Sequence, residues 1–296
     1  MKITNRKNLP QIIVDAVSND QYNPGEKTDY SVTTLLSPAY QKSLQKKHSD
    51  EIFEDVADRL WAMYGSAVHY IIELGAKDDD IIERRFYGEF SGWGLMRDDA
   101  KTVSAQIDHY RDGVITDWKL TSAYKVKKAL QSPDEDWTAQ LNVQKVLMEI
   151  AGHDVTELRI GAMVRDWTKA KFMSEEGYPD QIEYIEIPIW PKDQAISWIE
   201  DRIAAHEAPQ PCSQQERWQD DPTYAFTKKG GSRPAKVEKS RSAAMEYMDN
   251  KGWSLDDYEI IQRTGPNRRC EFYCNVNEFC DFYSETYLST NEMPFK

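Results

Sequence analysis

The sequence predicts an α/β protein with a central mixed sheet flanked by helices. Residues 81–119 carry a strand-like pattern, and residues 135–151 follow it with apolar positions at helical spacing. Two further strands are expected at 157–167 and 181–190, before a helix at 192–206. Strands that alternate with helices in this order are typical of an α/β core.

Composition and charge narrow the class of protein. The chain has 296 residues, of which 40% are hydrophobic and 29% charged, and these values exclude wholesale disorder. No apolar run approaches the roughly 18 residues that cross a bilayer, and the N-terminus carries no secretory signal, so we expect a cytoplasmic protein without membrane contact. The net charge of −13 argues against a general polyanion binder, although local basic patches can still bind nucleic acid.

The N-terminal part is expected to be mainly helical. A turn is predicted at Pro24-Gly25, and Ser31 is a candidate cap for a short helix. Residues 51–75 predict one long helix with one apolar stripe, because Val56, Tyr64, Ile71 and their neighbours recur at three- and four-residue steps.

A break at Pro209-Gln210-Pro211 divides the chain into an N-terminal domain of residues 1–211 and a C-terminal segment of residues 212–296. The C-terminal segment is expected to contain a hairpin around Gly230-Gly231 and a short helix and strand after it. The polar tail beyond Tyr283 is expected to be loose.

The pair Asp112-Gly113 lies between two strand-like runs and predicts a tight hairpin. If these two residues form the loop, Asp108 lies opposite Asp117, and Lys119 shares the face of Asp117 because side chains alternate along a strand. Facing carboxylates about 5 Å apart destabilise a sheet unless something offsets their repulsion. The hairpin therefore predicts a site for a bound cation.

All four cysteines lie in the last third of the chain, at Cys212, Cys270, Cys274 and Cys280. In a chain without a secretory signal, clustered cysteines more often bind metal than form disulfides. Three close thiols and a distant fourth suit one four-thiolate site, which zinc or an iron–sulfur cluster would satisfy. Unrelated buried thiols are the third alternative.

The set Asp108, Asp117-X-Lys119 resembles the core of the PD-(D/E)XK nucleases, in which an acid on one strand and acid-X-Lys on the next bind a divalent metal. The stretch from Gly65 to His69 looks like the family's Gly-X-X-X-His element, and Glu83 is a looser match to an accessory acid. Two further positions belong to the family's Gln-X-X-X-Tyr motif: Gln140 matches its glutamine, and Gln144 replaces its tyrosine.

The cysteine arrangement resembles the 4Fe–4S nucleases of the RecB-like branch, which includes CRISPR-associated exonucleases. Residues 211–218 and 224–229 are also similar to phage-encoded members of this group. The chain departs from the family in having three residues, instead of two, between Cys270 and Cys274. This departure keeps zinc as an alternative to the cluster.

The resemblance implies a restriction-endonuclease-like α/β core with a C-terminal iron–sulfur staple held by the four cysteines. It implies Mg²⁺ or Mn²⁺ bound by Asp108, Asp117, His69 and the carbonyl of Trp118, with Lys119 and Gln140 assisting catalysis and Glu83 and Gln144 as accessory positions. The activity would be hydrolysis of DNA by an exonuclease of end processing, recombination or repair, in a bacterial or phage-infected cell.

Single-stranded DNA or duplex ends would be the substrate, with a helicase or recombination protein as partner. Two other functions are weighed against this one. The first is a catalytically silent DNA- or protein-binding module on a nuclease scaffold, and the second is a structural protein stabilised by zinc.

Overall fold

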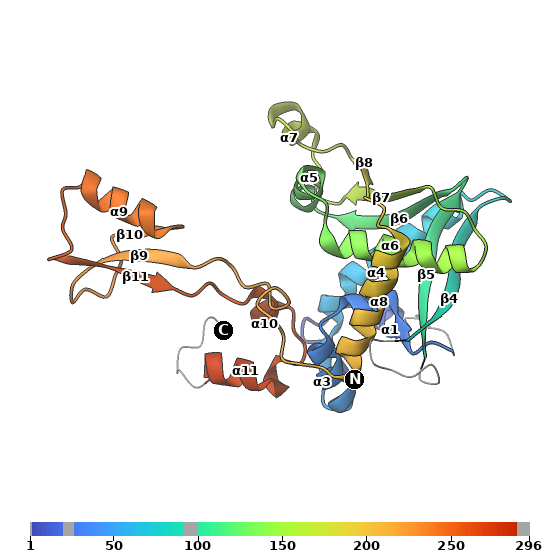
Figure 1. Cartoon of the computed structure of the whole chain (residues 1–296), viewed down its shortest axis with the longest axis horizontal. Helices are drawn as coiled ribbons and strands as arrows, with labels where there is room; N and C mark the ends of the chain where they lie inside the picture. The colour runs from blue at the N-terminus through green and yellow to red at the C-terminus, as the bar shows by residue number, and fades with distance from the viewer. Residues whose placement is uncertain (1, 20–26, 92–99, 289–296) are drawn as a thin grey trace. The chain divides into compact units, whose positions relative to one another are not determined.

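The computed structural model describes residues 2–19, 27–91 and 100–288 (Figure 1). The chain divides between Gln210 and Pro211 into two compact units. The expected turn at Pro24-Gly25 lies outside the described residues.

The N-terminal unit contains the expected mixed sheet flanked by helices. Its six strands are β2 (Tyr30–Ser31), β4 (Ile81–Phe90), β5 (Lys101–Arg111), β6 (Val114–Thr121), β7 (Glu157–Val164) and β8 (Ile182–Glu186). The middle strand β5 is antiparallel to β4 and β6 and parallel to the short β2. Strands β6 and β7 are parallel, and β8 returns antiparallel to β7.

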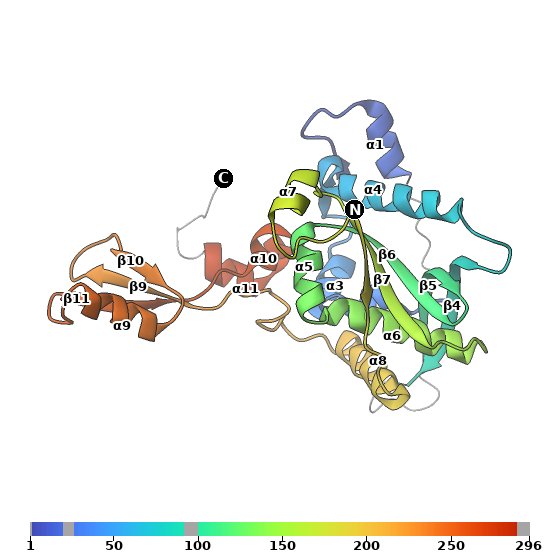
Figure 2. The same ribbon diagram turned by 90° about the horizontal axis from the view of Figure 1, so that it is seen from above.

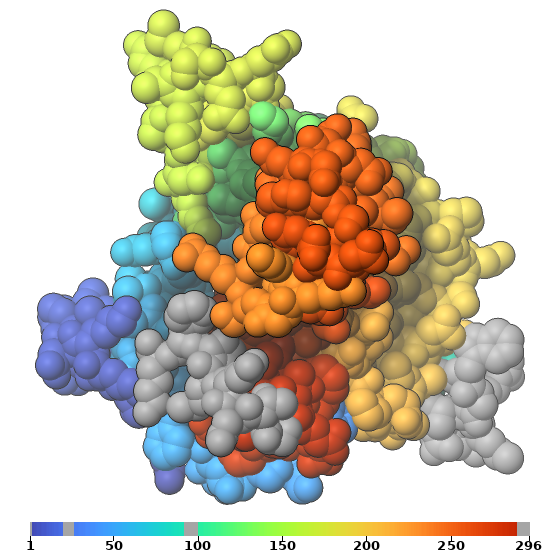
Figure 3. Space-filling view, turned by 90° about the vertical axis from the view of Figure 1, so that its left-hand side faces the viewer, coloured from blue at the N-terminus to red at the C-terminus, as the bar shows by residue number. Residues whose placement is uncertain are grey.

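The helices of this unit are α1 (Gln11–Ser18), α2 (Val32–Leu36), α3 (Ala39–Lys47), α4 (Val56–Glu73), α5 (Ala123–Gln131), α6 (Glu135–Ile150), α7 (Lys169–Ser174) and α8 (Lys192–Glu207). Helix α6 packs along β4 to β7, and α8 packs on α6. Figure 2 shows α1 and α4 on one side of the sheet and α6 and α8 on the other. Helix α7 projects from the unit, and it is yellow-green in Figure 3.

Apolar burial between the sheet and α6 fixes this arrangement. Ile107 on β5, Leu147 on α6, Ile160 on β7 and Ile199 on α8 are all fully buried. Burying side chains of this size stabilises a fold by roughly 1.5–3 kcal/mol each. The central strands and α6 are therefore the rigid frame on which polar groups can be held.

Capping residues set where several helices begin. The side-chain oxygens of Ser31, Ser122 and Asp134 accept hydrogen bonds from backbone N–H groups in the first turns of α2, α5 and α6. The predicted Ser31 cap is thus confirmed.

The prediction of one helix over 51–75 is wrong at its start. Residues Phe53–Asp55 form β3, which pairs in parallel with β1 (Lys2–Thr4), and α4 begins only after it. Asp55 stops the helix from extending further back, because its carboxylate accepts from the backbone N–H of Arg6 and of Ala57. In α4, only Val56 is buried.

The C-terminal unit is built around a three-stranded antiparallel sheet of β9 (Thr223–Lys228), β10 (Lys236–Glu238) and β11 (Tyr258–Arg263), with α9 (Arg241–Asn250) against it. The predicted hairpin around Gly230 is confirmed. Phe226, which is fully buried, stacks on Tyr258 with ring centroids 4.8 Å apart.

Cys212 precedes this sheet, and the segment with the other three cysteines follows it. It contains α10 (Arg268–Phe272), η2 (Asn277–Phe279), α11 (Asp281–Tyr283) and η3 (Ser284–Leu288). The expectation of a loose tail directly after Tyr283 is therefore wrong for 284–288, which form a helical turn. Within the described part of the chain, no helix has both the length and the apolar character needed to span a membrane.

Candidate metal centre

The β5–β6 hairpin has the register that the sequence predicts. Tyr110 pairs with Ile115, and the neighbouring pairs follow the same register. Asp112 and Gly113 both have left-handed backbones, with φ of 50° and 84°, as a two-residue loop of this hand requires. The hairpin is thus confirmed, and it sets the position of both acids.

The ladder between the two strands ends just before Asp108 and Asp117. The last paired residues are His109 and Thr116. Beyond the ladder, the Trp118 N–H donates to Asp108 Oδ2 at 2.9 Å. This side-chain bond holds the Asp108 carboxylate against the backbone between Asp117 and Lys119.

Asp117 is 1% exposed and is held from two directions. Gln140 and Gln144, one turn apart on α6, donate from Nε2 to Asp117 Oδ1 at 2.7 and 3.4 Å. The ammonium of Lys119 forms an ion pair with Oδ2. The structure therefore brings both glutamines to Asp117, including the one that stands in place of a tyrosine.

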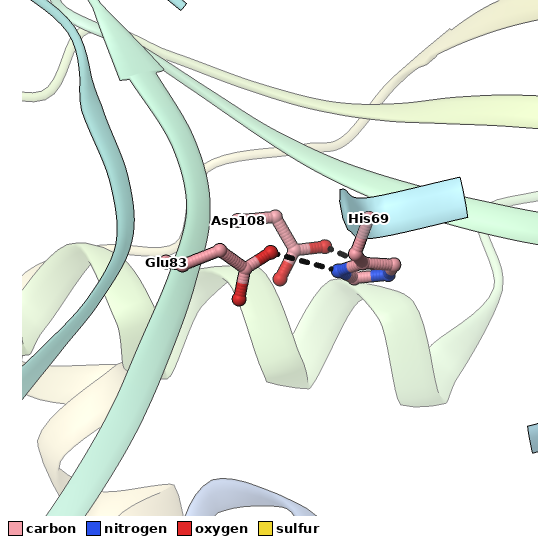
Figure 4. Close-up of side chains that lie close together, drawn as sticks. All are labelled: His69, Glu83 and Asp108. Carbon is pink, nitrogen blue, oxygen red and sulfur yellow. Dashed lines mark hydrogen bonds and ion pairs between the residues drawn. The ribbon is translucent and has the colours of Figure 1, made fainter. Parts of the chain in front are cut away.

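His69 reaches the acids from α4, which lies across the sheet from α6 (Figure 2). Its Nδ1 is 3.0 Å from Glu83 Oε1, and its Nε2 is 3.7 Å from Asp108 Oδ2. Figure 4 shows the three side chains converging, and candidate ligand atoms of all three lie within 4.8 Å of one another.

Glu83 is placed opposite Asp108 by the β4–β5 register, in which Ile82 pairs with His109 and Arg84 with Ile107. Its φ of 48° is left-handed, a strained conformation for a residue with a side chain. Strain of this kind is commonly concentrated at functional sites.

A second layer of polar groups, which the sequence analysis did not identify, supports Glu83. Gln106 donates from Nε2 to Glu83 Oε2, and Arg85 donates to Gln106 Oε1 at 2.9 Å and to Ser104 Oγ at 3.2 Å. The alternation of side chains along a strand could have identified Gln106, because it lies two residues before Asp108 and therefore shares its face. Its partner Arg85 follows only from the β4–β5 register, for which the sequence carried no local marker.

The closeness and burial of the acidic groups shift the pKa values of the residues in this centre. Burial, and then repulsion from Asp117, raise the pKa of Asp108 to about 7. The hydrogen bond to Glu83 raises the pKa of His69 to about 8 against the opposing effect of burial. Burial acts to lower the pKa of Lys119, but Asp117 and Asp108 outweigh it and raise that pKa, so the ammonium form is favoured.

The donor set fits a hard divalent cation. Carboxylate oxygens with one imidazole suit Mg²⁺ or Mn²⁺. Ligands at about 2.1 Å from such an ion lie at most about 4.2 Å apart, and the 3.7 Å between His69 Nε2 and Asp108 Oδ2 is within that limit. The centre opens into a cleft of about 620 Å³ lined by residues of α4, β4, β5 and β6, together with Gln140.

Trp118 points away from this cleft. Its ring lies over Gly161 on β7 and contacts Tyr184 on β8 with centroids 5.9 Å apart. The opposite orientations of Trp118 and its neighbours Asp117 and Lys119 agree with the predicted alternation. That the Trp118 carbonyl binds metal stays a prediction.

The four cysteines lie in the C-terminal unit, and the charges of Cys212, Cys274 and Cys280 all act on Cys270. Burial and then these neighbours raise the pKa of the Cys270 thiol to about 12. Among the described residues, His69, Glu83 and Asp108 form the one group with three candidate ligand atoms within 4.8 Å.

Comparison with known proteins identifies no family. No family model and no curated protein sequence matches the chain. Among solved structures, the chain is similar to the crystal structure of SSO0001, with 15% sequence identity and a TM-score of 0.47. The match covers 70% of this chain and 90% of that one.

Proposed function

We propose that the chain is a metal-dependent DNA nuclease with a PD-(D/E)XK core. The observation that carries this proposal is the convergence of Asp108, Asp117, His69 and Lys119 on one cleft. A binding module has no need of a buried pair of acids whose repulsion raises a pKa toward neutrality. A metal-dependent hydrolase does need them.

Asp108, Asp117 and His69 Nε2 would hold one or two Mg²⁺ or Mn²⁺ ions, with the carbonyl of Trp118 as a further ligand. A bound ion supplies a water molecule of lowered pKa and stabilises the charge that develops on the phosphate. Glu83 bonds the other ring nitrogen of His69, so we assign it the role of orienting the imidazole.

Lys119 contributes a fixed positive charge beside Asp117. Because the ammonium form is favoured, it serves as a donor that orients the attacking water and offsets charge on the phosphate. Gln140 and Gln144 hold the Asp117 carboxylate from α6. Acid, lysine and amides are thus fixed by rigid elements before a substrate arrives.

The proposal includes an iron–sulfur staple bound by Cys212, Cys270, Cys274 and Cys280. All four thiols are free and belong to one unit, which supports a shared four-thiolate site there. The RecB-like resemblance extends the proposal to an exonuclease that acts on DNA ends in recombination or repair, with single-stranded or duplex DNA as substrate.

The test is cleavage of end-labelled single- and double-stranded DNA with Mn²⁺ or with EDTA. We expect wild-type protein to cleave with Mn²⁺ only. Asp117→Ala and Lys119→Ala should each lose at least about 100-fold of the rate while keeping the wild-type circular dichroism spectrum. Asp193→Ala, an exposed acid on α8, serves as the matched control and should cleave normally.

Undiminished cleavage by Asp117→Ala would overturn the assignment of the site. DNA binding without cleavage by the wild-type protein would instead favour the catalytically silent module.

A further inference from the structure

An exposed aromatic ring stands beside the cleft with a cation on its face. Trp61 on α4 is 56% exposed, and the guanidinium of Arg165 lies 4.2 Å from the centroid of its ring. Arg165 directly follows β7 and is itself exposed. The guanidinium covers one face of the indole, and the exposed remainder of the ring is open to solvent beside a positive charge.

The residue spacing along α4 and the residue spacing along β6 give similar distances between this pair and the metal centre. Along α4, Trp61 precedes His69 by two turns, which at about 1.5 Å per residue is about 12 Å. Along β6, the Arg165 N–H donates to Thr121 O at 2.8 Å, and Thr121 follows Asp117 by four residues, or about 13 Å. The pair therefore lies beyond Lys119, at the end of β6, the strand that carries Asp117.

The surface between Trp61 and His69 is open because Gly65 occupies the intervening turn of α4. Gly65 lines the cleft, and no atom outside the adjoining helix backbone lies within 4 Å of where its Cβ would be. The Trp61 ring, the Gly65 backbone and the His69 imidazole thus follow one another at four-residue steps along α4.

We infer that Trp61 and Arg165 form a stacking subsite for an unpaired base of single-stranded DNA. This inference rests on the proposed nuclease function and names its substrate. The indole face offers a base the sequence-tolerant stacking used by single-strand binding proteins, and Arg165 offers a phosphate its charge.

A single strand fits this subsite better than a duplex does. Bases inside a duplex are stacked on both faces, so none presents a face to Trp61. The chain carries a net charge of −13, which repels DNA as a whole. A local cation next to the ring therefore favours the approach of a DNA strand at this position.

The experiment measures binding of a labelled single-stranded oligonucleotide to the full chain in EDTA, by fluorescence anisotropy. Trp61→Ala should weaken binding by roughly 5- to 100-fold, and Trp61→Phe, which keeps an aromatic face, by less. Arg165→Gln should weaken binding and reduce the slope of log affinity against log salt by about 0.7.

Oligonucleotides that carry one abasic position provide the second arm. When the abasic position is moved along the oligonucleotide, one position should weaken binding to the wild type but not to Trp61→Ala. Tyr124→Ala is the matched control, because Tyr124 is 77% exposed on α5 and belongs to no part of the cleft. It should bind as wild type.

The outcomes separate this inference from the function on which it rests. If the wild type binds and cleaves DNA while Trp61→Ala binds equally well, the subsite is wrong and the nuclease stands. Equal binding of intact and abasic oligonucleotides by the wild type would also overturn the subsite. A wild-type protein that neither binds nor cleaves any DNA overturns both.

Discussion

At the scale of single residues, the centre stores repulsion that a cation would relieve. Asp108 and Asp117 are both buried. Their hydrogen-bond donors, the Trp118 N–H and Gln140 Nε2, are uncharged and do not neutralise the two carboxylates. His69 adds an imidazole whose two nitrogens face two different carboxylates. The site thus favours bound protons in the absence of metal and a divalent ion in its presence.

This competition predicts a pH-dependent effect of metal on stability. Asp108 and His69 hold protons in the folded state up to about pH 7 and about pH 8, above their ordinary values of 3.8 and 6.5. Their contribution to the stability of the metal-free protein is therefore full below about pH 4 and is lost as the pH rises toward 8. Metal binding displaces these protons and is favoured over the same rise.

We expect Mn²⁺ to raise the midpoint of thermal unfolding much more near pH 8 than near pH 5, relative to EDTA. Differential scanning calorimetry of the wild type and of Asp117→Ala measures this. A shift of equal size at both pH values would contradict the linkage.

Glu83 is predicted to act through His69. Glu83→Gln keeps the size of the side chain but removes the charge that fixes the imidazole, so Mn²⁺ affinity should fall by about 10- to 100-fold. Isothermal titration of Mn²⁺ measures the loss, with Glu89→Gln on the same strand as control. If Glu83→Gln binds Mn²⁺ as the wild type does, Glu83 has no orienting role.

At the scale of elements, local signals in the sequence predicted the hairpin, the mixed sheet and α6. Asp112-Gly113 determines the loop, and the loop determines that Asp108 and Asp117 meet. What could not be predicted depends on tertiary contacts. The β3 strand exists because of β1, and the Arg85–Gln106–Glu83 network exists because of the β4–β5 register.

The β6–β7 pair makes a testable prediction about backbone position. A Cβ on Gly161 would overlap the Trp118 ring, which is too rigid to yield cheaply. We expect Gly161→Ala to lower the free energy of unfolding by about 1–3 kcal/mol and to disturb the backbone between Asp117 and Lys119. Urea unfolding measures the change.

The matched test is the double variant with Trp118→Ala, in which the overlap is gone. In the Trp118→Ala background, Gly161→Ala should lower the free energy of unfolding clearly less than it does in the wild type. An equal cost in both backgrounds would show that the Trp118 ring is not the obstacle.

At the scale of the whole molecule, two units carry the two proposed inorganic groups. The N-terminal unit holds the candidate metal centre on a well-buried frame, whereas the C-terminal unit has a small aromatic core around Phe226 and four thiols before and after its sheet. A segment with so little apolar burial gains stability when a metal group crosslinks it.

We therefore expect anaerobically purified protein to be brown, with absorption near about 400 nm and about four irons per chain. Cys270→Ala should lose the iron and make the residues after Pro211 sensitive to protease, while the N-terminal unit stays resistant. Cys270→Ser is the conservative companion. One equivalent of zinc in place of iron would establish the alternative structural site.

The most direct test of the account is a crystal of the protein soaked in Mn²⁺, with anomalous scattering used to locate the ion. We predict an anomalous peak in the cleft within about 2.0–2.3 Å of a carboxylate oxygen of Asp108, a carboxylate oxygen of Asp117 and Nε2 of His69. An empty cleft, or two acids turned away from each other, would contradict the proposal.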